Sequence, residues 1–597
     1  MKKQKYTLLA ISVSILCAGL FSCDQNNSVS DGRYADVFGA QWGCHDPKLF
    51  QDDDGTYYVY STGWQDGIQI RKSNDLAHWE KIDTSPLASE SKKSDIYGKM
   101  VWDDDFLKWT GCATNAGELF NTDYYRTSVK PESWAPTVIK QDGKYYMLHG
   151  IVSDCQTVRN KPHRAGCITM AISDSPEGPF LPAQQYNREL YAQSSLVRCV
   201  WSRTKNQSPS EIGYEGCFNS CDENWNSGFG TIDPEFVVDI ATGKLYIEKI
   251  GDTDCYAVTY GSWLGGIALL YVDAKTLKPV CTTAGVSSFD GQFYNVGDAM
   301  NAPADSISGN QGVKIAGGLG AAYEGAQVIF NSENGFFYIF VSMGNLFHEY
   351  RVGVGRSRKI TGPYLDTSDN AMSFSYTSDA AKYHLFGGKI LGAWQFGETS
   401  GDEYGFRSPG GQSILRDLSG RILLANHTRT NYFPTGNFTV QIHQMFFNEN
   451  NWPVLNMNDF NGENAHLAAL SKREIAGKYA VNLTRRAAHT DFVETTDGNT
   501  QEANAADGKE SFSMIAKLAA NGKIEGAYTG TWSTENGLIS LTVFQQNGDF
   551  LGNFDGIVMY ATDNARKNGK KSATVTFSAL CSSEGEKEGE YIFGNKM

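Results

Sequence analysis

The stretch His45-Asp46-Pro47-Lys48-Leu49-Phe50 places a carboxylate immediately before an apolar strand. An acidic turn follows at Asp52-Asp53-Asp54-Gly55, and the chain resumes as the aromatic strand Tyr57-Tyr58-Val59-Tyr60. Asp-Gly between two apolar runs is a strong hairpin signal. The stretch therefore predicts two antiparallel strands with an acidic side chain at the entrance to the first.

The same form recurs four more times, at intervals of roughly 90 residues. Each copy has an opening, an apolar strand, a turn at a glycine and a second strand. The five openings are His45-Asp46-Pro47, Trp134-Ala135-Pro136, Ile232-Asp233-Pro234, Tyr323-Glu324-Gly325 and Gly410-Gly411-Gln412. Repeats of about four strands are typical of propeller blades. A large β-sandwich or irregular β array would not need five matched openings, so we predict an all-β chain with a five-bladed β-propeller over residues 36–465.

Three stretches interrupt the repeat, at residues 85–130, 180–230 and 275–320. They are polar or glycine-rich and carry four tryptophans: Trp102, Trp109, Trp201 and Trp225. We expect them to be long loops on one face, where a propeller would build its site.

The repeat stops near Trp452-Pro453-Val454, and short alternating strands follow from about residue 470. Residues 470–597 therefore predict a small antiparallel β domain, either a sandwich or a barrel. This segment has no set of residues that suggests catalysis. We expect it to support the propeller or to contact carbohydrate.

The first residues indicate export. Lys2, Lys3 and Lys5 precede an apolar run that is too short to span a bilayer, as in a signal peptide over residues 1–22. The sequence Leu20-Phe21-Ser22-Cys23 resembles the lipobox of bacterial lipoproteins. It implies a lipid on Cys23, a tether over residues 23–35 and a place in the cell envelope, expected at the outer membrane. An ordinary secretory signal is the alternative.

The net charge and the cysteine content limit the classes of partner and of metal site that the chain could have. The formal net charge of −15 disfavours nucleic acid or an anionic membrane face as a partner and is compatible with a neutral substrate. Ten cysteines follow Cys23, without the paired CxxC units of a zinc site. The spacings Cys155/Cys167 and Cys217/Cys221 would suit local disulfides in an exported protein, but sequence leaves the connectivity open.

Three of the openings carry an acid: Asp46, Asp233 and Glu324. The first strand of every propeller blade lines the central axis, so these side chains should converge at one end of it. Three carboxylates close together cannot all keep ordinary pKa values, because burial and like charges raise some of them. A proton donor set apart from a base is what cleavage of a glycosidic bond needs. One such motif could be a simple turn, but three in register favour a site.

With its ordered motifs the chain resembles glycoside hydrolase family 43, and within it the arabinanases, over roughly residues 40–460. The motifs are His45-Asp46-Pro47, Ser73-Asn74-Asp75-Leu76, Trp134-Ala135-Pro136, Ser173-Asp174-Ser175-Pro176-Glu177-Gly178-Pro179, Ile232-Asp233-Pro234, Tyr260–Ile267, Tyr323-Glu324-Gly325 and Gly355-Arg356-Ser357. The stretches Asn426–Arg429, His443–Val454 and Gly589–Lys596 resemble the larger extracellular endo-arabinanases, which also carry a C-terminal β domain.

The resemblance implies a role for each acid. Asp46 would be the general base that activates water, and Glu324 the general acid that protonates the leaving oxygen. Asp233 would raise the pKa of the acid and orient it. Inversion requires the base and the acid to stand far enough apart to admit a water. His427 would face a calcium ion on the axis, partly through water, although a packed histidine is the simpler alternative.

The resemblance also suggests a sugar-contacting set: Thr231, Ile232, Ser262, Trp263 and Trp134. Core packing is the alternative for Trp134. The chain departs from the family after Trp-Ala-Pro, where Thr137 stands in place of the usual aspartate. Because that aspartate is not one of the three catalytic acids, the departure changes local contacts without excluding activity.

The leading hypothesis is thus an inverting endo-arabinanase that acts on α-1,5-linked arabinan as a monomer. The same fold and acids could instead serve an exo-arabinofuranosidase, a β-xylosidase or a galactanase. A non-catalytic glycan-binding surface lipoprotein is the alternative from another class, but binding alone would not require all three acids.

Overall fold

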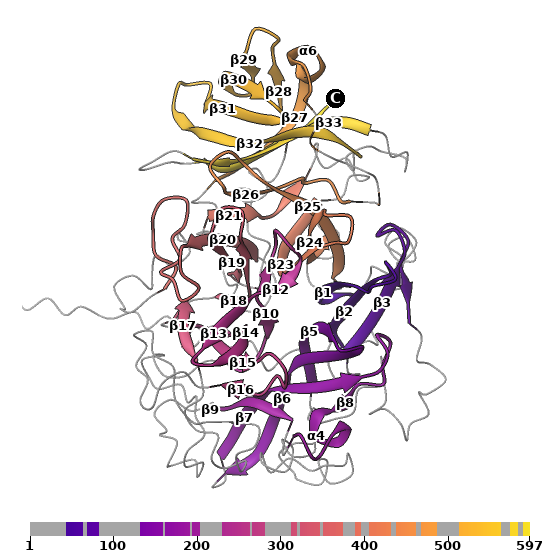
Figure 1. Cartoon of the computed structure of the whole chain (residues 1–597). Helices are drawn as coiled ribbons and strands as arrows, with labels where there is room; N and C mark the ends of the chain where they lie inside the picture. The colour runs from indigo at the N-terminus through magenta and orange to yellow at the C-terminus, as the bar shows by residue number, and fades with distance from the viewer. Residues whose placement is uncertain are drawn as a thin grey trace, which may run out of the picture.

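The computed structural model describes most of the repeats and of the C-terminal segment, and Figure 1 draws the rest as a thin grey trace. The described residues are 43–63, 68–82, 132–158, 161–191, 194–202, 230–262, 266–280, 312–318, 323–344, 346, 350–373, 388–395, 405–430, 438–460, 462, 467, 469–485, 513–562, 573–582 and 589–597. Cys23, Trp263 and the Cys217/Cys221 pair lie outside these ranges. Within them, no helix is long and apolar enough to cross a membrane.

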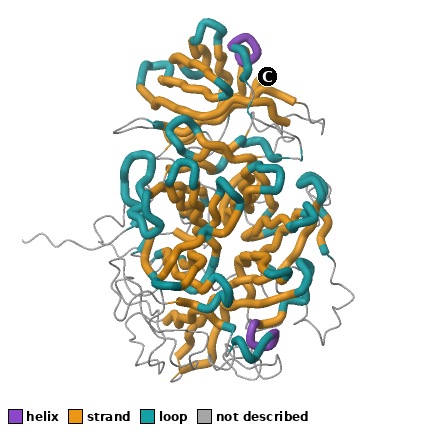
Figure 2. The backbone as a smooth tube through the Cα atoms, in the orientation of Figure 1, coloured by secondary structure: helices purple, strands orange, loops and turns teal. Residues whose placement is uncertain are grey.

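The strands form five antiparallel blades followed by a closed barrel, which confirms the predicted fold class (Figures 1 and 2). Blade 1 contains β1 (His45–Gln51), β2 (Tyr57–Thr62), β3 (Ile68–Ser73) and β4 (Glu80–Lys81). Blade 2 contains β5 (Glu132–Gln141), β6 (Lys144–Val158), β7 (Lys161–Ser173) and β8 (Leu181–Pro182), with helix α4 (Ala183–Tyr186) and β9 (Ser195–Ser202) after them. Blade 3 contains β10 (Glu235–Phe236), β13 (Ile247–Ile250), β14 (Thr253–Gly261), β15 (Ile267–Asp273), β16 (Pro279–Val280) and β17 (Val313–Ala316).

The last two blades continue the pattern. Blade 4 contains β18 (Tyr323–Asn331), β19 (Phe336–Met343), β20 (Arg351–Ser357) and β21 (Gly388–Leu391). The short strands β11 (Val238–Asp239) and β12 (Lys244–Leu245) join its sheet, and β11 runs parallel to β18. Blade 5 contains β22 (Trp394–Gln395), β23 (Gly405–Arg416), β24 (Ile422–Thr430), β25 (Thr439–Phe447) and β26 (Pro453–Leu455). The parallel pair β11–β18 joins blade 3 to blade 4.

All five openings share one backbone bend. One residue of each opening has a left-handed φ, at 49° for Asp46, 41° for Ala135, 57° for Asp233, 57° for Gly325 and 54° for Gly411. It is the second residue in four openings and the third in Tyr323-Glu324-Gly325. In blades 1, 2, 4 and 5 the strand register shifts across this point, as in a β-bulge. Glycine adopts this conformation freely, and aspartate tolerates it better than most residues. The bend therefore turns the chain in the same way at the entrance of every blade.

Two expectations from sequence were wrong in part. Residues 180–230 were expected to be a loop, but Ser195–Ser202 forms β9, which pairs with β7 and buries Leu196 and Val197. Its apolar residues find a partner because β8 pairs only with Ala171 and Ile172 of β7, which leaves residues 163–169 on that edge available to β9. The disulfide spacing Cys155/Cys167 also fails. Cys155 is opposite His163 and Cys167 opposite Ile151, so the two cysteines lie four positions apart along the hairpin. That is about 13 Å, beyond the reach of a disulfide.

Side chains between blades 5 and 1 close the ring. The Tyr57 hydroxyl donates to Asp417 Oδ2 at 3.0 Å and accepts from Arg421 Nη2 at 2.9 Å. Deeper in, the Leu49 amide donates to Ser413 Oγ at 3.1 Å. A buried apolar cluster that includes Leu49, Val59, Leu423 and Ile442 fills the space between these blades. These contacts join the first and last blades in the described structure.

The C-terminal domain is a barrel and not a sandwich. After the short helix α6 (Lys472–Ile475), eight strands pair in sequence order and the last pairs with the first. They are β27 (Gly477–Arg485), β28 (Met514–Leu518), β29 (Lys523–Gly526), β30 (Thr529–Glu535), β31 (Leu538–Phe544), β32 (Phe550–Thr562), β33 (Ala573–Cys581) and β34 (Gly589–Lys596). Buried and half-buried residues alternate along β31, as expected of a strand with one face in the barrel core.

The barrel packs against blades 4 and 5 through one apolar cluster. Phe593 meets Trp394 edge-on, with ring centroids 5.8 Å apart, and Tyr591 donates its hydroxyl to the Leu455 carbonyl at 3.1 Å. The amides of Asn458 and Asn595 exchange two buried hydrogen bonds, at 2.9 and 2.7 Å. The barrel therefore supports the outer side of two blades.

Candidate active site

The five openings surround a small cavity. It has a volume of about 30 Å³, enough for about two water molecules, and residues of all five openings line it. Asp46 and Asp233 are among these lining residues, and so is Gly325, which directly follows Glu324 in the chain. The predicted convergence of the first strands is therefore present. Glu324 stands one position earlier in its opening than the two aspartates do in theirs, at the place that His45 occupies in blade 1.

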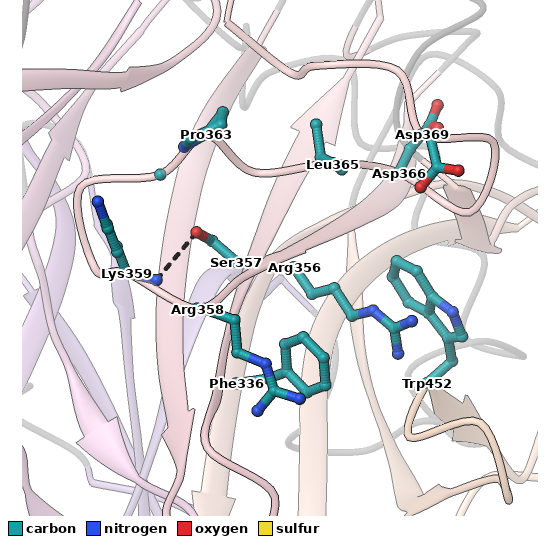
Figure 3. A pocket seen from close by; sticks show the side chains of 11 residues that line it. Phe336, Arg356, Ser357, Arg358, Lys359, Pro363, Leu365, Asp366, Asp369 and Trp452 are labelled. Carbon is teal, nitrogen blue, oxygen red and sulfur yellow. Dashed lines mark hydrogen bonds between the residues drawn. The ribbon is translucent and has the colours of Figure 1, made fainter.

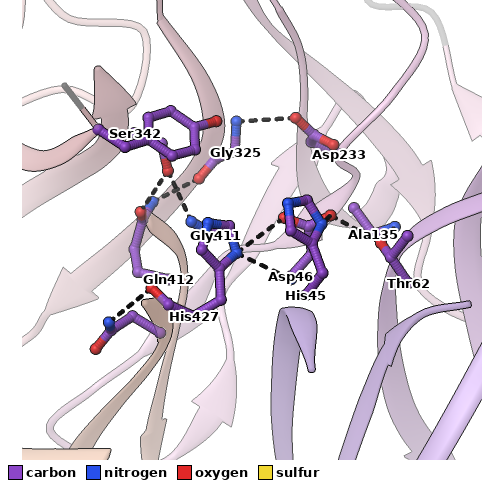
Figure 4. Close-up of polar contacts among 12 residues, drawn as sticks. His45, Asp46, Thr62, Ala135, Asp233, Gly325, Ser342, Gly411, Gln412 and His427 are labelled. Atoms are coloured by element: carbon purple, nitrogen blue, oxygen red, sulfur yellow. Dashed lines mark hydrogen bonds and ion pairs between the residues drawn. The ribbon is translucent and has the colours of Figure 1, made fainter. Parts of the chain in front are cut away.

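Asp46 is held by groups from blades 1 and 5 (Figure 4). Its Oδ2 accepts a hydrogen bond from Thr62 Oγ1 at 2.7 Å and lies 2.6 Å from His45 Nδ1. Its backbone N–H donates to His427 Nδ1 at 3.1 Å. Burial alone would raise the pKa of Asp46, but the adjacent His45, through its charge and its hydrogen bond, outweighs burial and holds this pKa well below its ordinary value. Asp46 is therefore ionised at neutral pH, as a general base must be.

His427 is a neutral acceptor at this place. Burial and the charge of His45, whose ring stacks on it at 4.3 Å, lower the pKa of His427 to about 3. Its Nδ1 also lies 3.4 Å from Asp46 Oδ1, but a neutral ring makes no ion pair there. Because Nδ1 accepts the Asp46 N–H, the proton of the neutral ring sits on Nε2. His427 thus fixes the backbone of Asp46.

The surroundings of Asp233 shift its pKa in the direction opposite to that of Asp46. Its Oδ2 accepts one hydrogen bond from the Gly325 N–H at 3.0 Å. Burial, followed by the charges of Asp46 and Glu324, raises the pKa of Asp233 well above its ordinary value. Two aspartates at matched positions therefore have pKa values shifted in opposite directions, so Asp46 is the one of the two that ionises readily.

Glu324 is oriented by two hydroxyl groups. Ser262 Oγ donates to its Oε2 at 2.8 Å, and the Tyr350 hydroxyl donates to its Oε1. Burial and the nearby Glu324 charge raise the pKa of Tyr350 well above its ordinary value, so the phenol keeps its proton and remains a donor. Both contacts fix the carboxyl group in one orientation, beside Asp233.

The residues expected to contact sugar differ in their burial and in their hydrogen-bond partners. Ser262 is buried and bonds Glu324, so its side chain serves the proposed acid. Thr231 is fully buried, whereas Ile232 is half-buried beside Asp233. Trp134 is also half-buried, and its indole N–H donates to Glu132 Oε2 at 3.0 Å. Trp263 lies outside the described residues.

The residues around His427 fit only a largely hydrated cation. The His427 Nε2 is buried without a hydrogen-bond partner, and ligand atoms of His45, Asp46 and His427 lie within 4.8 Å of one another. Calcium prefers about six to eight oxygen ligands, and Asp46 is the only carboxylate in this group. With its proton on Nε2, His427 would reach an ion through a water. The group therefore fits an ion that keeps most of its water shell.

Because Gly411 has no side chain, the Asp46 carboxylate and the His427 ring can approach each other beside it. A Cβ there would stand 2.6 Å from Asp46 Oδ1 and 2.7 Å from His427 Nδ1. Gly411→Ala should therefore displace the base and lower kcat by about 100-fold. Gly325→Ala is the matched control, because its φ is nearly the same but its Cβ would meet nothing closer than Ser342 Oγ at 3.1 Å. Steady-state kinetics on both variants should show the larger loss at 411. Equal losses would mean that backbone strain, and not displacement of Asp46, is responsible.

A larger pocket of about 320 Å³ is lined by residues of blade 4 and by Trp452 of blade 5, and by no residue of the five openings (Figure 3). The Arg356 guanidinium stacks there on Trp452 and Phe336, with Cζ 4.2 and 4.5 Å from the ring centroids. Its two carboxylates belong to one turn, where Asp366 accepts backbone N–H groups of that turn. No acid pair flanks this space, so we place the candidate site at the openings.

Sequence reasoning missed several groups that shape the site. Thr62 ends β2 and Tyr350 precedes β20, and neither belongs to a motif that predicts contact with an acid. Lys48 and Glu235 had a visible signal, because each is a charged residue inside an apolar strand, two positions after Asp46 and Asp233. Their contacts could not be derived from local pattern, since they cross between blades.

Comparison with known proteins gives a family match over two parts of the chain. Residues 290–453 match the family described as glycosyl hydrolases family 43, and residues 458–593 match a C-terminal lipocalin-like domain of that family. An extracellular endo-α-(1→5)-L-arabinanase of Thermotoga petrophila is 27% identical over 84% of this chain and 85% of its own length. The extracellular endo-α-(1→5)-L-arabinanase 2 of Bacillus subtilis is 25% identical over 92% of each chain.

Solved structures share the fold. The crystal structure of an endo-1,5-α-L-arabinanase from Thermotoga petrophila superposes with a TM-score of 0.61 over 93% of this chain and 99% of that one, at 22% identity. A family 43 glycoside hydrolase from Bacillus licheniformis gives a TM-score of 0.59 at 23% identity, over 93% of this chain and 98% of its own. The propeller and the barrel are thus found together in both structures.

Proposed function

The chain belongs to glycoside hydrolase family 43, and we propose that it is an endo-acting arabinanase that cleaves the α-1,5-linked backbone of arabinan with inversion. Relatives named as extracellular endo-arabinanases match it over most of its length and support a polysaccharide substrate. The observation that carries the chemistry is the convergence of the three acids: Asp46 and Asp233 line one cavity, and Glu324 directly precedes Gly325, which lines it too.

In this mechanism Asp46 accepts a proton from a water that attacks the anomeric carbon. Its low pKa keeps it ionised, and Thr62 and His45 fix its orientation. Glu324 protonates the departing glycosidic oxygen, with its carboxyl group held by Ser262 and Tyr350. Asp233 and Glu324 are neighbouring carboxyl groups that cannot both ionise easily, so one proton is retained between them before reaction. Each acid thus has one role, as an inverting mechanism requires.

The substrate is tested by incubating the protein with linear arabinan, xylan and galactan and separating the products over time. We expect arabinan alone to be cleaved at a substantial rate, with oligosaccharides of mixed length appearing first. A single short product from the outset would indicate exo action. Cleavage of xylan or galactan in preference to arabinan would replace the proposed substrate.

We further propose a calcium ion near His427, held mainly through water. Such an ion would supply positive charge beside Asp46 and would help order water there. We expect a chelator to lower kcat and the melting temperature together, and calcium to restore both. His427→Phe should make the melting temperature insensitive to the chelator. Unchanged activity and melting temperature after exhaustive chelation would count against the ion.

The proposed location is the cell envelope, with the protein exported as a monomeric lipoprotein anchored at Cys23. The basic and apolar leader and the Leu-Phe-Ser-Cys motif support it, as do relatives described as extracellular. Cys23→Ser should move the protein from the membrane fraction to the soluble fraction. An unchanged distribution would indicate an ordinary secretory signal.

A further inference from the structure

A buried ion pair crosses the cavity wall beneath the acids. Lys48 Nζ contacts Glu235 Oε1, and both residues are more than nine-tenths buried, at 7% and 8% exposure. Lys48 follows Asp46 by two positions and Glu235 follows Asp233 by two positions. All four residues line the same cavity. The pair therefore joins the two strands that present the proposed base and its neighbouring aspartate.

Glu235 is also the centre of a set that we call the axial polar ring, made of the residue two positions after the left-handed residue of each opening. Thr137 Oγ1 and Gln327 Nε2 both donate to Glu235 Oε1, at 3.1 and 3.3 Å. Gln327 then accepts the Ile414 N–H at 2.6 Å and donates to its carbonyl at 3.3 Å. The members of the ring are Lys48, Thr137, Glu235, Gln327 and Ser413. One residue from every blade thus stands at the same depth.

The charges in this ring are placed unevenly. Only blades 1 and 3 contribute a charged member, and these are the blades that carry Asp46 and Asp233. Replacing a buried ion pair by apolar residues of similar size is often neutral or stabilising, so stability alone does not explain the pair. Both aspartates have a left-handed φ, a conformation that persists only where surrounding contacts impose it. Contacts that fix these two strands relative to each other lie directly beneath them.

We propose that Lys48 and Glu235 are positioning residues, and that their ion pair fixes the spacing between the Asp46 and Asp233 carboxylates. The inference rests on the proposed function, because it assigns the pair a role in that reaction. Neither residue needs to touch substrate. Loss of the pair would let the two openings move independently, so the base would be misplaced relative to the acid while sugar contacts elsewhere stay intact.

The test compares variants that remove or shorten the pair. Glu235→Asp keeps the charge but shortens the side chain. The double variant Lys48→Met with Glu235→Met removes both charges while keeping side-chain volume. We expect both to fold and to lower kcat on arabinan about 10- to 100-fold, with KM changed less than about threefold, because misplacement by 1 Å can cost that much. Lys48→Met alone should be the least stable, since it leaves a carboxylate buried without its partner.

The matched control is the pair between the buried Asp417 and the half-buried Arg421, which is 2.7 Å long. Both residues contact Tyr57 where blade 5 meets blade 1, and neither lines the cavity of the acids. Asp417→Asn with Arg421→Met should change the melting temperature but leave kcat near the wild-type value. Wild-type kcat in both folded Lys48 and Glu235 variants would overturn the inference. The wild-type protein is assayed alongside the variants, so that failure of the positioning role can be told from failure of the proposed function. If the wild-type protein cleaves a glycan other than arabinan, the variants are compared with it on that glycan.

Discussion

Replacing Glu324 by glutamine is expected to lower kcat on linear arabinan by about 10²- to 10⁴-fold, the usual contribution of a general acid. Glutamine keeps the size of the side chain and can still bond Ser262 and Tyr350, but it has no proton to give to the leaving oxygen. The loss should therefore fall on kcat, with KM nearly unchanged. Steady-state kinetics checks this, and Glu333→Gln, an exposed glutamate in the turn of the same blade, is the control.

The leaving group distinguishes an acid from a residue that only shapes the site. An aryl arabino-oligosaccharide with an acidic phenol needs little protonation when it departs. Glu324→Gln should therefore recover most of its rate on that substrate. An equal loss on the aryl substrate and on arabinan would show that Glu324 does not act as the proton donor.

Replacing Asp46 by asparagine is expected to cause a similar loss, about 10²- to 10⁴-fold in kcat, on both substrates. Asparagine is the suitable replacement because it tolerates the left-handed φ of 49° at this position. It can accept the Thr62 hydrogen bond but cannot take a proton from water. Recovery on the aryl substrate would contradict the role of base, and Asp53→Asn in the exposed turn of the same blade controls for surface charge.

The low pKa of Asp46 has a consequence for pH dependence. A depressed pKa keeps the base ionised, so its contribution is lost only as the pH falls through that low value. The kcat/KM of the wild-type protein should therefore fall on the alkaline side, as the acid loses its proton, and show no limb from Asp46 at mildly acidic pH. A rate that drops as the pH decreases from 6 to 5, with folding intact, would contradict this assignment.

Much of the fold was predictable because its determinants are local. Each blade can be recognised in the sequence by an opening, a turn at a glycine and two apolar strands, all within a short stretch of chain. Local sequence could not distinguish a barrel from a sandwich in the C-terminal domain, because the difference depends on whether β27 pairs with β34 at the far end of the domain. β9 was missed because β8 and α4 separate it from its partner β7, so the two strands do not form a simple hairpin.

The same distinction applies to the site. The positions of Asp46, Asp233 and Glu324 follow from the repeat, because every opening reaches the same cavity. Their surroundings do not follow from it. Lys48 and Glu235 are separated by 187 positions, and Asp46 and His427 by 381, so only the closed ring brings them together. Sequence could thus identify the acids but not the contacts that shift the pKa values of the two aspartates in opposite directions.

The most direct test of the central claim is the anomeric configuration of the first product, followed by proton NMR during hydrolysis of linear α-1,5-arabinan by the wild-type protein. Asp46 acting as a base on water, opposite Glu324, predicts that the β-anomer of the new reducing end forms first and then equilibrates. Initial formation of the α-anomer would contradict the account, because it would require a covalent intermediate on the enzyme.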